Sequence, residues 1–338
     1  MALARSRPVT LLDVAAAAGV SHQTVSRVIN QHPNVSGKTR AKVLSSIGKL
    51  GYTPNRMARA LVTSSARTVG IVGFGVNYFG PARMLVSIEE AIRASGYDLT
   101  FVTLEKPNLA ALQAAVDRLA SSAVDGVVII APIIGLDAEQ VACLHRRVPV
   151  VMTAVPLGAE VASVILDQEE GSRLATRHLI DLGHTYIAEV SGPLSWNDAK
   201  LRHKGWLDAL AAAGLPAGPH AEGDWTAQSG YAAAVKLLDA GEPFTGVVGG
   251  NDQMALGALR ALYERGLSVP GDVSVVGFDN IPESGFFSPP LTTVDQDFSA
   301  MGQQSVEHLL ALIQHPNTPM SQRVLYPRLV LRSSTRKL

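Results

Sequence analysis

The chain has 338 residues, of which 47% are hydrophobic and 17% charged, and at about 150 residues per domain this length allows two or three domains with real cores. Its single cysteine, Cys143, excludes a disulfide framework and a cysteine-based zinc site. Lys plus Arg number 29 and Asp plus Glu number 29, and this zero formal charge, taken over the whole chain, argues against binding to nucleic acid.

The charge is, however, unevenly distributed along the chain. Residues 1–62 hold nine basic residues and one acid, Asp13, so this segment carries a net charge of +8 and the remaining residues carry −8. Such an asymmetry predicts a small basic module that binds a polyanion, carried by a larger body with a different task.

Neither a membrane span nor an export signal is recognisable. No apolar run reaches the ~18 residues that a transmembrane helix needs, and no apolar segment of the signal-peptide kind lies near the first residue. A single cysteine fits a reducing compartment. We therefore expect a soluble, cytoplasmic protein.

The basic segment begins with a helix-turn-helix pattern. Thr10 and Asp13 form a capping pattern, and apolar residues recur at helical spacing over residues 11–18. Gly19 can adopt the positive φ that ends a helix, and Ser21 is a suitable cap for the next one. Two short helices joined by a tight turn that contains glycine make a helix-turn-helix.

In this motif the N-terminal residues of the second helix contact base edges in the major groove. Here those residues are His22, Gln23 and, one turn later, Arg27, and none of them belongs to the apolar face of the helix. Gln pairs with adenine and Arg with guanine through two hydrogen bonds each. Polar residues on any exposed helix give the same pattern, so the motif by itself leaves DNA binding open.

A third helix and a short basic segment follow. Ser36 caps a helix predicted over residues 37–50, with Lys38 near its start in a place that suits phosphate contacts. Residues 56–61 are too few for a helix that is stable alone, so we expect them to order against a partner. Leu61 at their end is either an apolar wedge of the kind that minor-groove binders insert between base steps or an ordinary linker leucine.

The acidic body alternates short β-branched runs with helical stretches. Nine strands are predicted, at residues 69–74, 99–104, 126–130, 148–153, 163–166, 186–191, 246–249, 273–278 and 291–294. Alternation of this kind predicts parallel sheets with helices on both faces. About 270 residues exceed one such sheet, so we expect two βαβ subdomains with a cleft between them.

Several polar side chains and one indole follow predicted strands, where ligands of open α/β sheets bind. They are Arg202, Trp225, Asn251, Asp252, Asp279, Asn280 and Gln296. Carboxylate, amide and guanidinium groups hydrogen-bond vicinal hydroxyls while an indole covers the apolar face of a ring, so this set predicts a sugar or polyol site. Asp and Asn after strands also cap helices or form turns, and this alternative stays open.

Several motifs resemble those of the lactose repressor family over nearly the whole chain: D-V-A-A-A-A-G-V-S-H-Q-T-V-S-R-V-I-N, G-Y-T-P-N-R-M-A-R-A-L, N-D-Q-M-A-L-G-A and P-P-L-T-T-V-D-Q-D-F. The resemblance implies an all-α helix-turn-helix head plus an α/β periplasmic-binding-protein-like core of two doubly wound parallel-sheet subdomains. The boundaries expected are 1–54 for the head, 55–66 for the hinge helix and linker, and 67–338 for the core, with 67–166 and 298–325 in one subdomain and 167–297 and 326–338 in the other.

The resemblance also implies roles for individual residues. Contacts of a homodimer with a pseudopalindromic double-stranded DNA operator are implied for Thr10, Ser21, His22, Gln23, Thr24, Ser26, Arg27, Asn30, Asn34, Tyr52, Asn55, Arg56, Ala58 and Leu61. Effector binding is implied for Phe74, Tyr78, Ile130, Ala154, Arg202, Trp225, Asn251, Asp279, Gln296 and Phe298. The repressor that gives the family its name has a tyrosine at the position of His22, so the base recognised there is expected to differ.

One end of the implied sugar pocket departs from the family pattern. Phe74, Ile130 and Ala154 stand where the name-giving repressor has small polar or acidic side chains. An apolar wall leaves a sugar hydroxymethyl group unpaired, which costs roughly 1–3 kcal/mol. We therefore expect a ligand with an apolar or absent substituent at that end, such as a pentose, a deoxy sugar or an aryl glycoside.

We expect a transcription regulator, specifically a repressor that a small sugar or glycoside releases from its operator; the alternative is the same fold corepressed by a purine-like ligand. No leucine heptads follow Thr335, so a homodimer is expected rather than a tetramer. No cofactor is expected, because Gly73 and Gly75 lack the third glycine of a dinucleotide-binding motif. No metal or catalytic residue is expected, because the sequence has no G-x-S-x-G or H-E-x-x-H motif and its nine histidines are dispersed. A sugar-transport protein would begin with a secretion signal instead of a basic head.

Overall fold

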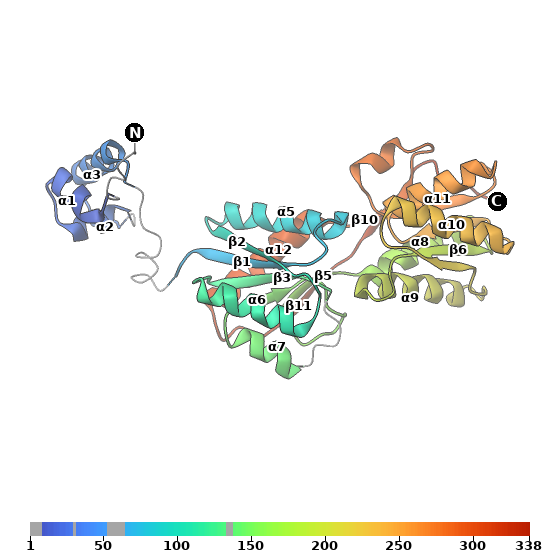
Figure 1. Ribbon diagram of the computed structural model, residues 1–338, viewed down its shortest axis with the longest axis horizontal. Helices are drawn as coiled ribbons and strands as arrows, with labels where there is room; N and C mark the ends of the chain where they lie inside the picture. Colours follow the sequence, from blue (N-terminus) through green and yellow to red (C-terminus); the bar gives the residue numbers. More distant parts are fainter. Residues whose placement is uncertain (1–8, 30–31, 53–64, 133–137) are drawn as a thin grey trace, which may run out of the picture. The chain divides into compact units, whose positions relative to one another are not determined.

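The computed structural model describes residues 9–29, 32–52, 65–132 and 138–338, and the chain divides into two compact units, Met1–Ala66 and Arg67–Leu338 (Figure 1). The first unit is called the head below and the second the core. Within the described ranges, no helix is both long enough and apolar enough to cross a membrane.

The described residues of the head form three helices: α1 (Leu11–Ala18), α2 (His22–Ile29) and α3 (Gly37–Leu50). The backbone N–H of Asp13 donates to Thr10 Oγ1 over 3.3 Å, and the backbone N–H of Thr10 donates to Asp13 Oδ2 over 2.8 Å, so the predicted capping box is present. Gly19 ends α1 with a φ of +62° and Gly51 ends α3 with a φ of +63°. Both lie in the left-handed region that favours glycine. The predicted helix-turn-helix and third helix are confirmed.

The first of the two sheets in the core has the strand order β11-β5-β4-β3-β1-β2, and all its strands are parallel. The strands are β1 (Thr68–Gly73), β2 (Asp98–Thr103), β3 (Gly126–Ile130), β4 (Val150–Met152), β5 (Ser163–Leu166) and β11 (Gln322–Leu325). Apolar side chains of α5 (Phe79–Ala94) and α12 (Phe298–Gln314) pack on one face, and those of α6 (Leu109–Ser121) and α7 (Ala138–His145) on the other (Figure 1).

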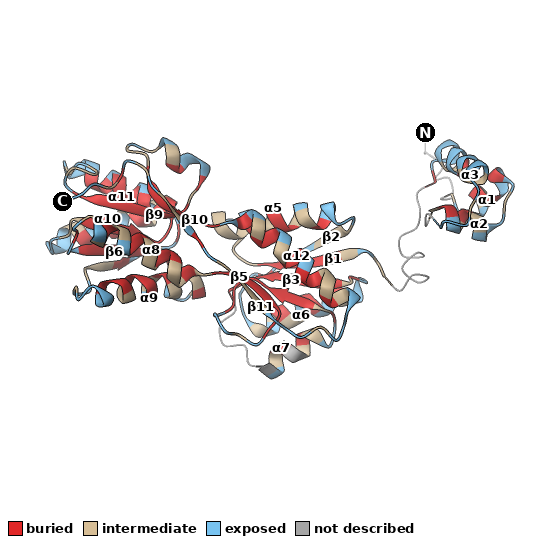
Figure 2. Cartoon of the chain, turned by 180° about the vertical axis from the view of Figure 1, so that it is seen from behind, coloured by how far each residue is buried: buried red, intermediate tan, exposed pale blue. Residues whose placement is uncertain are grey.

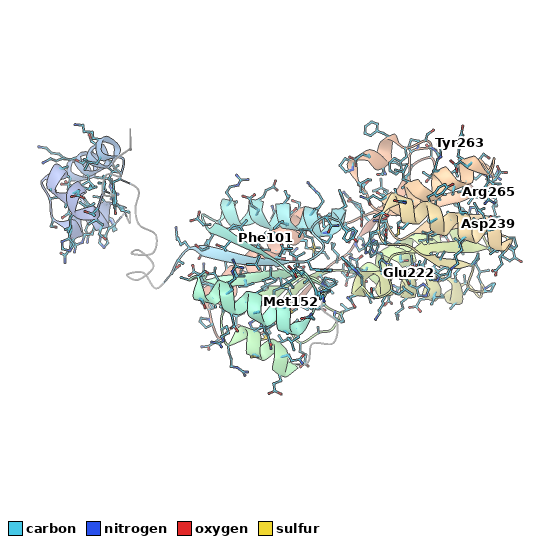
Figure 3. All side chains as sticks on the ribbon, in the orientation of Figure 1. Phe101, Met152, Glu222, Asp239, Tyr263 and Arg265 are labelled. Carbon is cyan, nitrogen blue, oxygen red and sulfur yellow. The ribbon has the colours of Figure 1, made fainter. Side chains whose placement is uncertain are left out.

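Burial in this sheet follows strand position. Met152 on the inner strand β4 is 1% exposed, whereas Phe101 on the edge strand β2 is 37% exposed (Figure 3). The inner strands are buried on both faces, as expected of a parallel sheet covered by helices (Figure 2). This sheet and its four helices form the first subdomain.

The second sheet has the order β12-β10-β9-β8-β6-β7 and is parallel except for β12, which runs antiparallel to β10. Its strands are β6 (Ile187–Ser191), β7 (His220–Glu222), β8 (Gly246–Gly249), β9 (Ser274–Asp279), β10 (Thr292–Asp295) and β12 (Arg328–Val330). Helices α8 (Gln168–Asp181) and α9 (Asn197–Ala212) pack on one face, and α10 (Ala227–Ala240) and α11 (Asp252–Glu264) on the other. A short 3₁₀ helix covers Pro282–Phe286. These elements form the second subdomain.

The chain passes between the two sheets three times: after β5, after β10 and between β11 and β12. All nine strands expected from the sequence are present, with ends that differ by at most two residues. Strands β11 and β12 are not among those nine; Pro327 lies between them, and they belong to different sheets. Proline has no N–H to donate and interrupts the strand. Strand β7 was not expected.

Close packing of α8 against α9 requires a glycine. A Cβ on Gly205 would lie 2.2 Å from the carbonyl oxygen of Glu169, which cannot move without separating the two helices. Gly205→Ala should therefore destabilise the core by about 2 kcal/mol, even though alanine is favoured over glycine in a helix by about 1 kcal/mol.

The matched control is Gly48→Ala in α3, where the new Cβ meets no atom within 4 Å. This change should stabilise the head by up to about 1 kcal/mol. Calorimetry of the full chain measures both variants. Equal effects of the two substitutions would contradict the close helix contact.

Candidate functional site

A cavity lies between the two subdomains, beside the carboxyl ends of their strands. It is lined by Tyr78, Phe79, Gly80, Pro81, Met84, Thr153, Ala154, Val155, Ile165, Leu166, Gln168, Trp196, Asn197, Asp198, Leu201, Arg202, Trp225, Asn251, Asp279, Gln296, Phe298 and Met301. The first subdomain contributes mainly apolar side chains, whereas most of the charged and amide groups come from the second. This is the position at which open α/β sheets bind ligands.

Arg202 is the central charge of the cavity. It is 7% exposed, its Nε donates to Gln168 Oε1 over 2.9 Å, and a terminal nitrogen donates to the carbonyl oxygen of Gly250. The other terminal nitrogen lies 3.4 Å from Asp279 Oδ1, and the guanidinium carbon lies 3.7 Å from the ring centroid of Phe278. These contacts fix the position of the guanidinium and leave little freedom to its planar group.

Amide groups extend this network across the cavity wall. Gln168 Nε2 donates to Gln296 Oε1 over 2.8 Å, and Gln296 Nε2 donates to Asp279 Oδ1 over 2.5 Å. Asp279 has a φ of +103°, at the end of β9, which turns the chain sharply into the site. The strained backbone and the directed hydrogen bonds together hold the carboxylate in place.

Burial changes the acidity of the carboxyl groups here. Loss of solvation raises the pKa of Asp279 from 3.8 to about 6, although Arg202 opposes the rise. Burial likewise raises the pKa of Asp198, again opposed by Arg202. Burial raises the pKa of Asp252 to about 7. Perturbed pKa values of this kind mark candidate functional sites.

Asp252 has a supporting role, because its side chain is fully buried behind the cavity wall. Its Oδ1 accepts from Thr293 Oγ1 over 2.5 Å and its Oδ2 accepts from the Ile281 backbone N–H over 2.8 Å. These bonds connect α11 to β10 and to the turn that follows Asp279. Asp252 therefore positions the site and does not line it.

Four aromatic rings form a connected cluster, and three of them, Tyr78, Trp196 and Trp225, line the cavity. Trp196 lies 6.0 Å from Trp225, 5.5 Å from Tyr78 and 5.4 Å from Phe74 between ring centroids. The indole N–H of Trp225 is buried and has no hydrogen-bond partner within the described part of the chain. A Cβ on Gly192 would lie 2.2 Å from the Trp225 ring, so only glycine leaves room for this indole.

Eight of the ten effector residues expected from the sequence line the cavity. They are Tyr78, Ala154, Arg202, Trp225, Asn251, Asp279, Gln296 and Phe298. Asn251 also caps α11, as the alternative interpretation held: its Oδ1 accepts from Met254 N–H over 2.8 Å and its Nδ2 donates to the Trp225 carbonyl oxygen over 3.0 Å.

The other two, Phe74 and Ile130, are not among the residues that line the cavity. Phe74 packs beside the core of the first subdomain and against Trp196, and Ile130 is 1% exposed inside the sheet. Conversely, Trp196 and Asp198 line the cavity but were missed. Asp198 precedes Arg202 by four residues, a spacing that places both on one face of α9. That spacing was the sequence signal that could have identified Asp198 as a cavity residue.

The DNA-recognition residues expected in the head lie mostly on its surface. Ser21, His22, Gln23, Arg27 and Asn34 are exposed, Thr24 and Ser26 are partly exposed, and Thr10 is exposed within the capping box. Tyr52 is an exception: it is 8% exposed and belongs to the core of the head, where its ring packs against the helices. Asn30, Asn55, Arg56, Ala58 and Leu61 lie outside the described residues.

The comparison with known proteins agrees with this architecture. Residues 10–55 match the family "Bacterial regulatory proteins, lacI family", and residues 176–335 match "Periplasmic binding protein-like domain". The lactose operon repressor of Escherichia coli (strain K12) is 40% identical over 91% of this chain and 86% of its own length. The HTH-type transcriptional repressor PurR of Glaesserella parasuis is 36% identical over 97% of this chain and 99% of its own length.

A solved structure gives the same result. The crystal structure of the lac repressor dimer bound to operator and the anti-inducer ONPF has a TM-score of 0.90 and 38% identity, and covers 98% of this chain and 100% of that one. A helix-turn-helix head followed by a periplasmic-binding-protein-like core defines the class of DNA-binding transcriptional repressors. The chain belongs to the lacI family of bacterial regulatory proteins.

The raised pKa of Asp279 predicts that the core is more stable in acid than near neutrality. The folded state holds the proton of Asp279 up to about pH 6, whereas the unfolded chain loses it near pH 3.8. The stabilisation is complete below 3.8 and is lost as the pH rises through about 6. Its size is about 3 kcal/mol, and Asp252, with a pKa of about 7, acts in the same direction.

Asp279→Asn should therefore flatten the fall in melting temperature of the core between about pH 4 and pH 7. The matched control is Asp208→Asn, because Lys204 lowers the pKa of this exposed carboxyl group and its titration lies below that range. Unfolding curves at several pH values measure the slope. An unchanged slope in Asp279→Asn would show that the buried proton is elsewhere.

Proposed function

We propose that this repressor is released from its operator by a small sugar or glycoside that binds in the cavity of the core. One observation carries the proposal: a fixed guanidinium, a carboxylate and two amides line the same cavity as an indole, whose ring centroid lies 5.4 Å from the guanidinium carbon. Arg202, Asp279 and Gln296 supply donors and acceptors for vicinal hydroxyls. Trp225 supplies an apolar face for a sugar ring, and its unpaired indole N–H is free to donate.

The opposite wall sets the chemistry of the other end of the ligand. Phe79, Ala154, Val155 and Phe298 line this side, and none of these side chains has a hydrogen-bonding group. A hydroxymethyl group placed there would lose hydrogen bonds to water at a cost of roughly 1–3 kcal/mol. The ligand therefore has an apolar or absent substituent at this end, as in a pentose, a deoxy sugar or an aryl glycoside.

Release follows from the position of the cavity between two subdomains. A ligand that contacts Phe298 and Arg202 together binds one relative arrangement of the subdomains more tightly, and only such differential affinity shifts the equilibrium between arrangements. That shift weakens DNA binding, and by linkage DNA binding weakens ligand binding equally.

DNA recognition falls to the exposed start of α2. Gln23 and Arg27 provide contacts to adenine and guanine in the major groove, and Lys38 in α3 provides a phosphate contact. A homodimer places one such helix in each half of a pseudopalindromic operator. The related structure of the lac repressor, a dimer bound to operator, supports this arrangement.

A second ligand class is a purine-like base that acts as corepressor. The related repressors named PurR favour it, and the indoles of Trp196 and Trp225, whose planes meet at 70°, each offer a face on which a flat base could stack. The two ligand classes predict opposite effects on the affinity for the operator. A sugar that releases the operator supports the first, and a base that tightens operator binding supports the second.

Trp225→Phe should weaken sugar binding about tenfold, because it removes one hydrogen-bond donor and part of the stacking surface. Trp206→Phe is the matched control: Trp206 is also buried with an unpartnered indole N–H, but it packs among α8, α9 and β9, not in the cavity. Thermal-shift screening identifies the sugar, and calorimetry compares the variants. Equal affinities of the two variants would overturn the proposed site.

The apolar end of the cavity is tested with a sugar pair. A 6-deoxy sugar should bind at least as tightly as its parent galactose, because the parent leaves a hydroxyl unpaired. Calorimetry on the same preparation measures both. Tighter binding of galactose would contradict an apolar subsite.

Arg27→Ala should reduce affinity for the selected operator by about 1–3 kcal/mol and relax base preference at one position. Lys38→Ala should weaken binding to all duplexes alike and lower the slope of log affinity against log salt by about 1. Binding sites selected from random duplexes, followed by titration at several salt concentrations, separate the two effects. The same response from both variants would refute the assignment of base and phosphate contacts.

A further inference from the structure

Three potential metal ligands meet in the second subdomain, outside the residues that line the ligand cavity. Glu189 lies on β6 and His220 on the neighbouring edge strand β7, paired directly in register. His203 extends from α9, which packs on the same sheet. Their ligand atoms all lie within 4.8 Å of one another.

The distances converge on a single carboxylate oxygen. Glu189 Oε2 lies 2.5 Å from His203 Nδ1 and 3.8 Å from His220 Nε2. Two ligands of a tetrahedral zinc ion are about 3.4 Å apart when each lies about 2.1 Å from the metal. To bind zinc, the distance from Glu189 to His203 must increase by about 0.9 Å and the distance from Glu189 to His220 must decrease by about 0.4 Å. Rotation of the side chains accomplishes both changes.

We propose that Glu189, His203 and His220 bind a zinc ion. Two imidazole nitrogens with one carboxylate form a donor set that zinc uses, with a fourth position left for water. Magnesium and calcium prefer oxygen ligands, so the two histidines select against them.

The surroundings favour a formed site. The Glu189 side chain is only 2% exposed, whereas those of His203 and His220 are 25% and 28% exposed, so the carboxylate is held inside while an ion reaches it from solvent. Trp206 packs beside His203, with 5.5 Å between the ring centroids, and is itself 1% exposed. Glu222, two residues beyond His220 on β7, adds negative charge near this edge (Figure 3).

The hydrogen bonds of these three side chains are consistent with exchange for an ion. His220 Nε2 lies 2.8 Å from the hydroxyl of Ser191, which can rotate away. His203 and Glu189 satisfy each other through their short contact. An ion would connect β6, β7 and α9, and His203 directly follows Arg202 in α9. The site would therefore restrain the helix that carries the central charge of the ligand cavity.

Calorimetric titration of zinc chloride into the chelator-treated full chain tests the proposal. We expect one saturable equivalent per chain, and a Cys143→Ser background keeps the only cysteine from contributing. His220→Gln should weaken binding at least tenfold, since even loss of an outer-shell partner costs tenfold or more. This variant keeps the hydrogen bond between Glu189 and His203, so it leaves the helix contact intact.

His315→Gln, at an exposed position just after α12, is the matched control and should bind zinc as the parent does. Cobalt supplies a second measurement: the intense visible absorption of a four-coordinate site should appear in the parent and disappear in His220→Gln. Absence of a saturable equivalent, or equal zinc affinity in both histidine variants, would overturn the proposal.

Discussion

The guanidinium of Arg202 is a full positive charge that is almost completely removed from water, and the cavity is organised around it. Removal of an ion from water costs several kcal/mol, and only well-directed partners compensate. Asp279, Gln168 and the carbonyl oxygen of Gly250 supply them. Each partner comes from a different element, so satisfying one charge fixes the relative positions of β9, α8, α9 and the turn after β8. The polar groups offered to a ligand are thereby in place before it arrives, which lowers the entropic cost of binding.

Loss of solvation in the same cavity makes the neighbouring carboxyl groups weaker acids. It raises the pKa values of Asp279 and Asp198, and Arg202, one cation close to both groups, opposes the rise without cancelling it. Two poorly solvated carboxyl groups beside one cation do not ionise as easily as in water. The protonation state of these two carboxyl groups therefore depends on their burial as much as on their being aspartates.

The helices and strands that are determined by neighbouring residues in the sequence were predictable. Caps at Thr10 and Ser36 and left-handed glycines at Gly19 and Gly51 mark the head helices, and runs of β-branched residues mark the inner strands. Strand β7 has only three residues, one of them alanine, so neither length nor β-propensity indicated it.

Site residues that directly follow a strand were predictable from the sequence. Site residues were not predictable where their position depends on which side of a helix faces the cavity, or on which face of a strand they occupy. The strand that ends with Ile130 is buried on both faces, so its apolar run shows no alternation to tell the cavity side from the core side. Trp196 reaches the cavity through the start of α9 and through contacts with Tyr78 of the other subdomain. No local pattern encodes such a contact between distant segments.

The three passages of the chain between the sheets impose an order on folding. The first sheet lacks an edge strand until β11 is made, and the second lacks β12, which pairs with β10. Ser334 is fully buried in the second sheet, where its hydroxyl accepts from Thr292 N–H over 2.8 Å and donates to the Val275 carbonyl oxygen over 2.6 Å. Neither subdomain can therefore be completed during synthesis until almost the whole chain has left the ribosome. The head, whose contacts are local, can fold long before, and would be exposed to DNA while the part that regulates it is still incomplete.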